Sequence, residues 1–74
     1  MAIHDLKIDA PHLIALMSGK KKAEIRKNDR FYQVGDTLNF FEYDVKSTIT
    51  HITDFPEGLR DEYVCLSVTV PQAY

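Results

Sequence analysis

Residues 64–70 read Val-Cys-Leu-Ser-Val-Thr-Val, so apolar side chains alternate with smaller or more polar ones. A period of two is typical of a β-strand with one buried face, and Pro71 directly after it predicts the end of the strand. The chain has 74 residues, of which 45% are hydrophobic and 27% are charged. Such a chain has enough apolar surface for one small core, so we treat residues 1–74 as a single domain.

Four further strands are predicted by alternation or by β-branched residues, at residues 3–8, 21–26, 38–43 and 47–53. In the second of these, Ala23 and Ile25 are expected on the dry face, with Glu24 and Arg26 facing water. The apolar positions of 47–53 change parity midway, which predicts a β-bulge. Residues 55–58, Phe-Pro-Glu-Gly, break the pattern and predict a turn.

One short helix is expected between the first two strands. Asp9 stands before Ala10 and Pro11, and proline is tolerated in the first turn of a helix, where an acidic side chain can satisfy the free amides. Leu13, Leu16 and Met17 follow at helical spacing, and Gly19 suits the left-handed residue that ends a helix. The predicted helix is therefore only about two turns long.

The strand at 38–43 carries large apolar residues on both of its faces. Leu38 and Phe40 share one face, and Phe41 and Tyr43 share the other, so both faces need cover. Five short strands and one early helix of this kind favour a closed sheet over a flat one with open edges. The predicted fold class is α+β, a small closed or nearly closed β-barrel of about five strands with one short N-terminal helix.

Several classes of protein are excluded or disfavoured by the composition. The longest uninterrupted apolar run, Leu13 to Met17, is too short to cross a bilayer and has no charged start before it, so a cytoplasmic location is expected. Cys65 is the only cysteine, which excludes a disulfide framework and a cysteine-rich zinc site. The three histidines are widely spaced, so we expect no metal and no cofactor.

The basic residues are concentrated in one segment. Residues 20–30 contain six basic and two acidic residues, a formal charge of +4, whereas the rest of the chain carries −6. A local basic patch attracts anions, and an acidic remainder discourages non-specific coating of long nucleic acids. The patch is therefore a candidate binding site, although a solvated lysine-rich turn gives the same composition.

The segment from Ser18 to Asp36 reads S-G-K-K-K-A-E-I-R-K-N-D-R-F-Y-Q-V-G-D. It resembles the ASCH domains of the PUA-like superfamily, most closely a small phage-associated branch whose function is not established. The matching positions of the central motif are Gly19, Lys21, Glu24 and Arg26. Weaker similarity extends over most of the chain, at residues 4–8, 28–30, 34–36, 55–56 and 63–64.

The resemblance implies a PUA-like barrel with a cleft floored by the motif strand, in proteins associated with RNA or modified nucleosides. The residues themselves are compatible with this, because Glu24 and Arg26 lie two apart on one strand face and project into the same space. Lys21 has the opposite parity and must precede the strand or lie beside a bulge. The predicted ligand-binding residues are Lys21, Glu24 and Arg26, with Lys22, Lys27 and Arg30 as outer electrostatic support.

The expected ligand is RNA or a nucleotide or nucleoside, on which Tyr32, Phe41 or Tyr43 could stack if they are not core residues. Alternatively, Glu24 and Arg26 form only exposed ion pairs. A second hypothesis follows from ASCH amidohydrolases that act on acylated cytidine nucleosides, in which Lys21 and Glu24 would be catalytic. There the family's threonine is replaced by Glu24, and Glu62 is a candidate for its distant glutamate without motif support. A third is a protein–protein interaction module of phage origin that binds a host protein.

Overall fold

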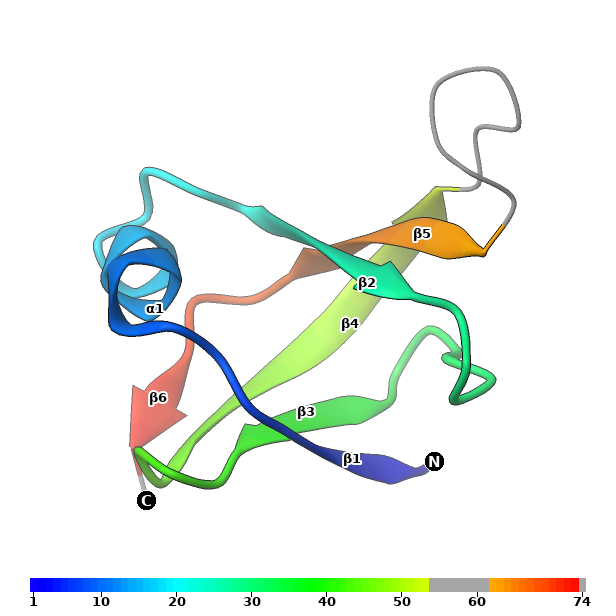
Figure 1. Cartoon of the computed structure of the whole chain (residues 1–74), viewed down its shortest axis with the longest axis horizontal. Coiled ribbons are helices and arrows are strands. Elements are labelled where there is room, and N and C mark those ends of the chain that lie inside the picture. The colour runs from blue at the N-terminus through cyan, green and yellow to red at the C-terminus, as the bar shows by residue number, and fades with distance from the viewer. Residues whose placement is uncertain (54–61, 74) are drawn as a thin grey trace.

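The computed structural model describes residues 1–53 and 62–73 of the chain, and they form one helix and six strands (Figure 1). The elements are β1 Ile3–Leu6, α1 Ala10–Met17, β2 Ala23–Lys27, β3 Thr37–Phe40, β4 Val45–Thr53, β5 Tyr63–Val68 and β6 Gln72–Ala73. The α+β class, the helix and the five predicted strands are confirmed, whereas β6 was not predicted. The turn predicted at residues 55–58 lies outside the described residues.

The strands form a mixed sheet in the order β1-β3-β4-β5-β2, and β6 pairs with the start of β4. Of the strand pairs in the described residues, β1 and β3 run parallel and the other four are antiparallel. In Figure 1, β1 and β3 lie on one side of the molecule and β2 and β5 on the other, with β4 crossing between them. Within residues 1–53 and 62–73, β1 and β2 do not pair with each other, so the sheet is open and the predicted closed barrel is wrong.

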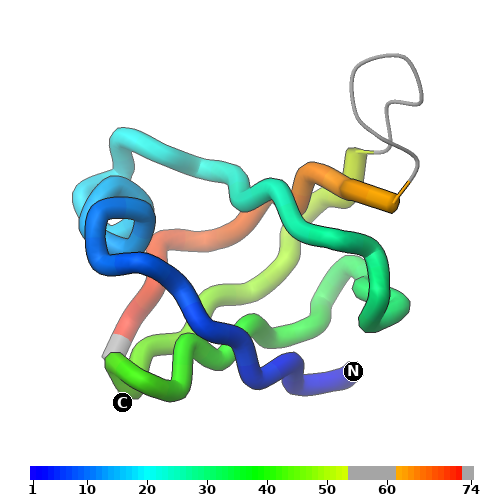
Figure 2. The backbone as a smooth tube through the Cα atoms, viewed as in Figure 1, coloured from blue at the N-terminus to red at the C-terminus, as the bar shows by residue number. Residues whose placement is uncertain are grey.

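The long strand β4 connects the two sides of the molecule. Its first residues pair with β3 and its last residues pair with β5, and the register shifts between Ile49 and His51. This irregularity confirms the predicted bulge, which allows one strand to bend from one part of the sheet into the other. Figure 2 shows the β4 backbone passing between the two sides.

The hydrophobic core fills the space between these two sides and is closed at one end by α1. The fully buried side chains Leu38, Phe40 and Leu66 come from β3 and β5, and α1 contributes Leu13 and Leu16. Asp9 precedes the helix as predicted, but its side chain makes no cap hydrogen bond. At eight residues α1 is far too short to cross a bilayer, and the described part of the chain contains no other helix.

β3 is shorter than predicted. It ends at Phe40, and residues 41–44 turn directly into β4, with a backbone hydrogen bond from Tyr43 N to Phe40 O and a left-handed Asp44 at φ 53°. Phe41 and Tyr43 are therefore not on the far face of a strand, and they remain 48% and 44% exposed. Aspartate tolerates the left-handed conformation, which is why the chain reverses here despite the apolar neighbours.

Candidate functional site

The inner face of β2 carries charged side chains instead of apolar ones. In the antiparallel pairing with β5, Glu24 lies opposite Leu66, and Arg26 lies opposite Val64. Because Val64 and Leu66 are buried in the core, this register places Glu24 and Arg26 on the concave side. Glu24 is only 6% exposed, whereas Ile25 on the other face is 55% exposed, so the predicted dry and wet faces of β2 are exchanged.

The turn after α1 places Lys21 beside these two residues. Gly19 takes a left-handed φ of 77°, as predicted for the end of the helix, and the Lys21 amide then donates to the Ala15 carbonyl at 3.0 Å. Lys21 therefore stays close to the helix and precedes β2, which begins at Ala23. This resolves the parity conflict between Lys21 and Glu24 without a bulge in β2.

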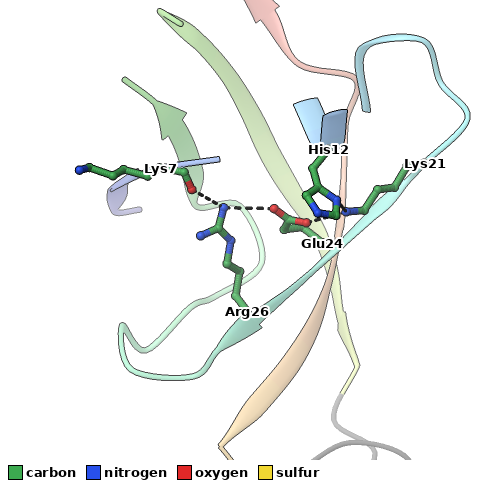
Figure 3. Close-up of polar contacts among 5 residues, drawn as sticks. All are labelled: Lys7, His12, Lys21, Glu24 and Arg26. Atoms are coloured by element: carbon green, nitrogen blue, oxygen red, sulfur yellow. Dashed lines mark hydrogen bonds and ion pairs between the residues drawn. The ribbon is translucent and has the colours of Figure 1, made fainter. Parts of the chain in front are cut away.

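The three side chains meet at the Glu24 carboxylate (Figure 3). Lys21 Nζ donates to Oε1 at 2.8 Å, and Arg26 Nη2 donates to Oε2 at 3.1 Å. Lys21 Nζ also lies 3.2 Å from His12 Nδ1, at the start of α1. Each carboxylate oxygen thus has a cationic partner, which explains how a charged residue is tolerated at a nearly buried position.

Arg26 also spans the opening between β1 and β2. Its Nη2 donates to the Lys7 carbonyl at 2.7 Å, and Lys7 lies just after β1. Both hydrogen bonds of Arg26 use Nη2, and within the described residues Nη1 makes none, which leaves it available to an acceptor. A side chain rather than a backbone ladder therefore bridges the gap between these strands.

A cleft of about 700 Å³ lies over this gap. Lys21, Glu24 and Arg26 line it together with Lys7, Asp9, His12 and Glu42. Sequence analysis missed these last four as site residues, because they come from the β1–α1 connection, α1 and the turn after β3, which meet only in the folded chain. The similarity at residues 4–8 was the one signal that pointed to this side of the cleft.

The cleft is electrostatically balanced. Three basic residues and three acidic residues line it, so its formal charge is zero with His12 neutral. It therefore offers both hydrogen-bond donors and acceptors without a strong preference for anions. Within residues 1–53 and 62–73, no three His, Cys, Asp or Glu side chains are grouped to hold a metal ion.

The remaining predicted residues lie outside this cleft. Lys27 and Arg30 line a neighbouring pocket that also includes Arg26, whereas Lys22 is exposed and lines neither cavity. Glu62 is exposed just before β5 and does not line the cleft, and its backbone carbonyl accepts a hydrogen bond from the Asn28 amide. The geometry thus separates the six predicted binding residues into three groups.

A second buried carboxylate lies away from the cleft. Asp36 accepts hydrogen bonds from the Ala2 amide at 3.0 Å, the Gln33 amide at 3.0 Å and His4 Nε2 at 2.8 Å. The backbone bond from Ala2 and the bond from His4 are the main reasons why the pKa of Asp36 falls from 3.8 to about 2. The His4 ring packs on Tyr32, whose ring is buried with its pKa raised by burial, so Tyr32 is a core residue.

Comparison with known proteins places the chain among phage-associated domains of unknown function. A family model described as "Domain of unknown function (DUF3850)" matches residues 3–68. A protein of Escherichia phage P2, described as "Uncharacterized 12.9 kDa protein in GpA 3'region", is 40% identical over 72 residues, covering 86% of this chain. The match spans 65% of the length of that phage protein.

Proposed function

The chain belongs to the DUF3850 family. We propose that it is a binding module for a nucleoside unit, either in RNA or in a nucleotide, and that this unit is held in the cleft of Lys21, Glu24 and Arg26. The ASCH-like similarity of the central motif suggested this class of ligand. One observation supports the proposal most strongly: Lys21 Nζ and Arg26 Nη2 both contact the Glu24 carboxylate, at 2.8 and 3.1 Å, in a single cleft.

The size and the charge of the cleft support a nucleoside. Its volume of about 700 Å³ lies in the range of roughly 300–1,000 Å³ that is common for small-ligand sites. A nucleoside is uncharged and presents both donors and acceptors, which matches a lining with a formal charge of zero. An anion alone would gain little from a lining in which acidic and basic groups balance.

Each motif residue has a specific task in this proposal. Glu24 can accept hydrogen bonds from base amino or imino groups or from a ribose hydroxyl. Arg26 offers Nη1 to a base carbonyl while Nη2 stays on Glu24 and Lys7. Lys21, whose side chain is 30% exposed, can turn from Glu24 toward the ligand. Ligand binding then replaces contacts that the free protein makes with itself.

Calorimetry or NMR titration with the four ribonucleosides and N4-acetylcytidine tests the proposal. We expect at least one of them to bind the wild-type chain, and Glu24→Gln to weaken that binding at least tenfold. The matched control is Asp44→Asn, which also removes one negative charge but at an exposed position outside the cleft. Absence of binding by the whole panel, or equal losses in both variants, contradicts the proposal.

Hydrolysis of an acylated cytidine nucleoside is the second candidate, supported by the position of Lys21 between Glu24 and His12. Glu24 would take a proton from an attacking water, whose oxygen bonds to the acyl carbon. Lys21 would then protonate the leaving amine as the carbon–nitrogen bond breaks. The products are a carboxylic acid and the free amino nucleoside, so no further reactant is needed.

Turnover of N4-acetylcytidine, followed by chromatography, separates this candidate from simple binding. The hydrolase hypothesis expects cytidine to be released by the wild type and not by Lys21→Ala or Glu24→Ala. Binding without turnover leaves the module as proposed and contradicts the hydrolase. A salt-sensitive, nuclease-resistant interaction with a host protein, without any nucleoside binding, favours the third hypothesis, a protein interaction module.

A further inference from the structure

We infer that the pocket next to the cleft is a subsite for the phosphate and the flanking base of a nucleotide, so that the ligand is a segment of single-stranded RNA rather than a free nucleoside. This inference rests on the proposed function. The pocket has a volume of about 400 Å³ and is lined by residues from β1, β2, the loop after β2 and the turn after β3.

The two cavities are adjacent because they share side chains. Arg26 and Lys7 line both of them, and the hydrogen bond from Arg26 Nη2 to the Lys7 carbonyl lies at their junction. A ligand whose nucleoside contacts Glu24 therefore needs to extend only past Arg26 to enter the second pocket. The backbone of a nucleic acid is the part of such a ligand that continues beyond the nucleoside.

The charge of the second pocket differs from that of the cleft. Two acidic residues line the pocket against four basic ones, which gives a formal charge of +2, compared with zero in the cleft. The basic residues are Lys7, Arg26, Lys27 and Arg30, and the acidic ones are Asp5 and Asp29. A phosphate is stabilised by such an excess of guanidinium and ammonium groups, whereas a neutral nucleoside is not.

Two aromatic residues, Tyr32 and Phe41, line this basic pocket, but Tyr32 is a core residue that is only 8% exposed. Phe41 lines the pocket and remains 48% exposed, because the turn after β3 carries it out of the core. A base that follows the phosphate can stack on such a ring, and stacking of this kind tolerates any base. Tyr43 is exposed to a similar degree but lines neither cavity. The inference therefore assigns stacking to Phe41 and not to Tyr43.

Binding of a matched ligand series measures the subsite directly. The series consists of the nucleoside that binds best, its 3′- and 5′-monophosphates and the two corresponding dinucleotides. We expect one monophosphate to bind at least tenfold more tightly than the nucleoside, with an advantage that falls as salt rises. The dinucleotide with the same phosphate linkage should bind more tightly still, and a longer strand of four nucleotides at least as tightly.

Two pairs of variants assign the effect to residues. Lys27→Gln with Arg30→Gln should remove the advantage of the phosphate and leave nucleoside affinity unchanged. The control, Lys20→Gln with Lys22→Gln, removes the same charge from the same basic segment outside both cavities and should retain that advantage. Phe41→Ala should weaken the dinucleotide about tenfold without affecting the monophosphate, and Tyr43→Ala should have no such effect.

The outcomes separate the subsite from the function on which it rests. If neither nucleosides nor nucleotides bind, the proposed function fails and the subsite fails with it. If a nucleoside binds but its monophosphates bind no more tightly, the subsite is wrong while the cleft remains. The same conclusion follows if both double variants lose the affinity gained from the phosphate to the same extent. If monophosphates bind tightly and dinucleotides do not, the ligand is a free nucleotide, which contradicts the assignment to a strand.

Discussion

Asp36 and Glu24 are both nearly buried carboxylates, with exposed fractions of 4% and 6%, but their partners differ in kind. Asp36 is held by two backbone amides and by the buried ring of His4. Among the described residues, the Glu24 carboxylate is held by the ends of two long side chains, Lys21 and Arg26, which are 30% and 22% exposed. The first set of partners is fixed by the fold, whereas the second can rearrange.

The difference supports a structural role for Asp36 and the binding role proposed for Glu24. Fixed backbone donors tie the N-terminal residues and the turn before β3 together through Asp36, so the arrangement stabilises one structure. Flexible cationic partners at the wall of a cleft can exchange one acceptor for another at little cost. The two carboxylates are equally buried, so the exposure and the kind of their partners, rather than burial, distinguish them.

Of the substitutions that test this comparison, Asp36→Ala is expected to cause the largest loss of stability. It leaves the amides of Ala2 and Gln33 and the His4 ring without their acceptor, and buried donors without partners are strongly destabilising. Urea unfolding should show a greater loss of stability than substitution of Lys21, Glu24 or Arg26 in the cleft. Asp9→Ala is the control, since the Asp9 side chain makes no cap bond and its loss should cost at most about 0.5 kcal/mol. Equal losses in the two variants would contradict the structural role of Asp36.

The next effect concerns pH. Because the pKa of Asp36 is lowered from 3.8 to about 2 in the folded chain, the unfolded chain binds the proton more tightly. The contribution of Asp36 to stability is present above about pH 4 and is lost as the pH falls toward 2. Urea unfolding at a series of pH values should show this slope in the wild type, and a smaller slope in Asp36→Asn. If Asp36→Asn does not fold, an NMR titration of the Asp36 carboxyl in the wild type tests the same shift.

The same contrast explains what sequence analysis could and could not predict. Turn chemistry is local, so Gly19 was correctly predicted to be left-handed, and the parity change in β4 correctly indicated a bulge. The faces of β2 were assigned incorrectly, because local alternation favours burial of Ile25 over Glu24. The register with Val64 and Leu66 decides the orientation instead, and that pairing is not visible within β2.

Local sequence patterns also could not predict whether the sheet closes into a barrel. Aromatic residues at 40, 41 and 43 suggested a strand with two covered faces, but the turn at 41–44 exposes the last two. Lys21, Glu24 and Arg26 were selected together by the spacing of the motif, and the structure brings them into contact. The positions of His12 and Glu42 in the cleft depend on how α1 and the β3–β4 turn pack, so sequence spacing could not identify them as lining residues.

Glu24→Gln sharpens the comparison because its effects on stability and on binding should separate. Glutamine keeps the shape of the side chain and one acceptor oxygen, and Lys21 and Arg26 can reach water, so the cost in stability should be about 1 kcal/mol or less. Nucleoside binding should nevertheless weaken at least tenfold. Urea unfolding and calorimetry on the same samples measure both quantities. A loss of stability as large as that of Asp36→Ala would place Glu24 in the same structural class.

The smallest effect is expected from His12→Ala, which removes the 3.2 Å contact between Nδ1 and Lys21 Nζ but leaves the bond from Lys21 to Glu24. His12 is exposed, so unfolding should change by at most about 0.5 kcal/mol. Because His12 holds Lys21 on the helix side of the cleft, nucleoside affinity should fall about twofold, and His12→Gln should restore part of it by offering an acceptor. A tenfold loss in His12→Ala with unchanged stability would instead show that His12 contacts the ligand directly, as Glu24 is proposed to do.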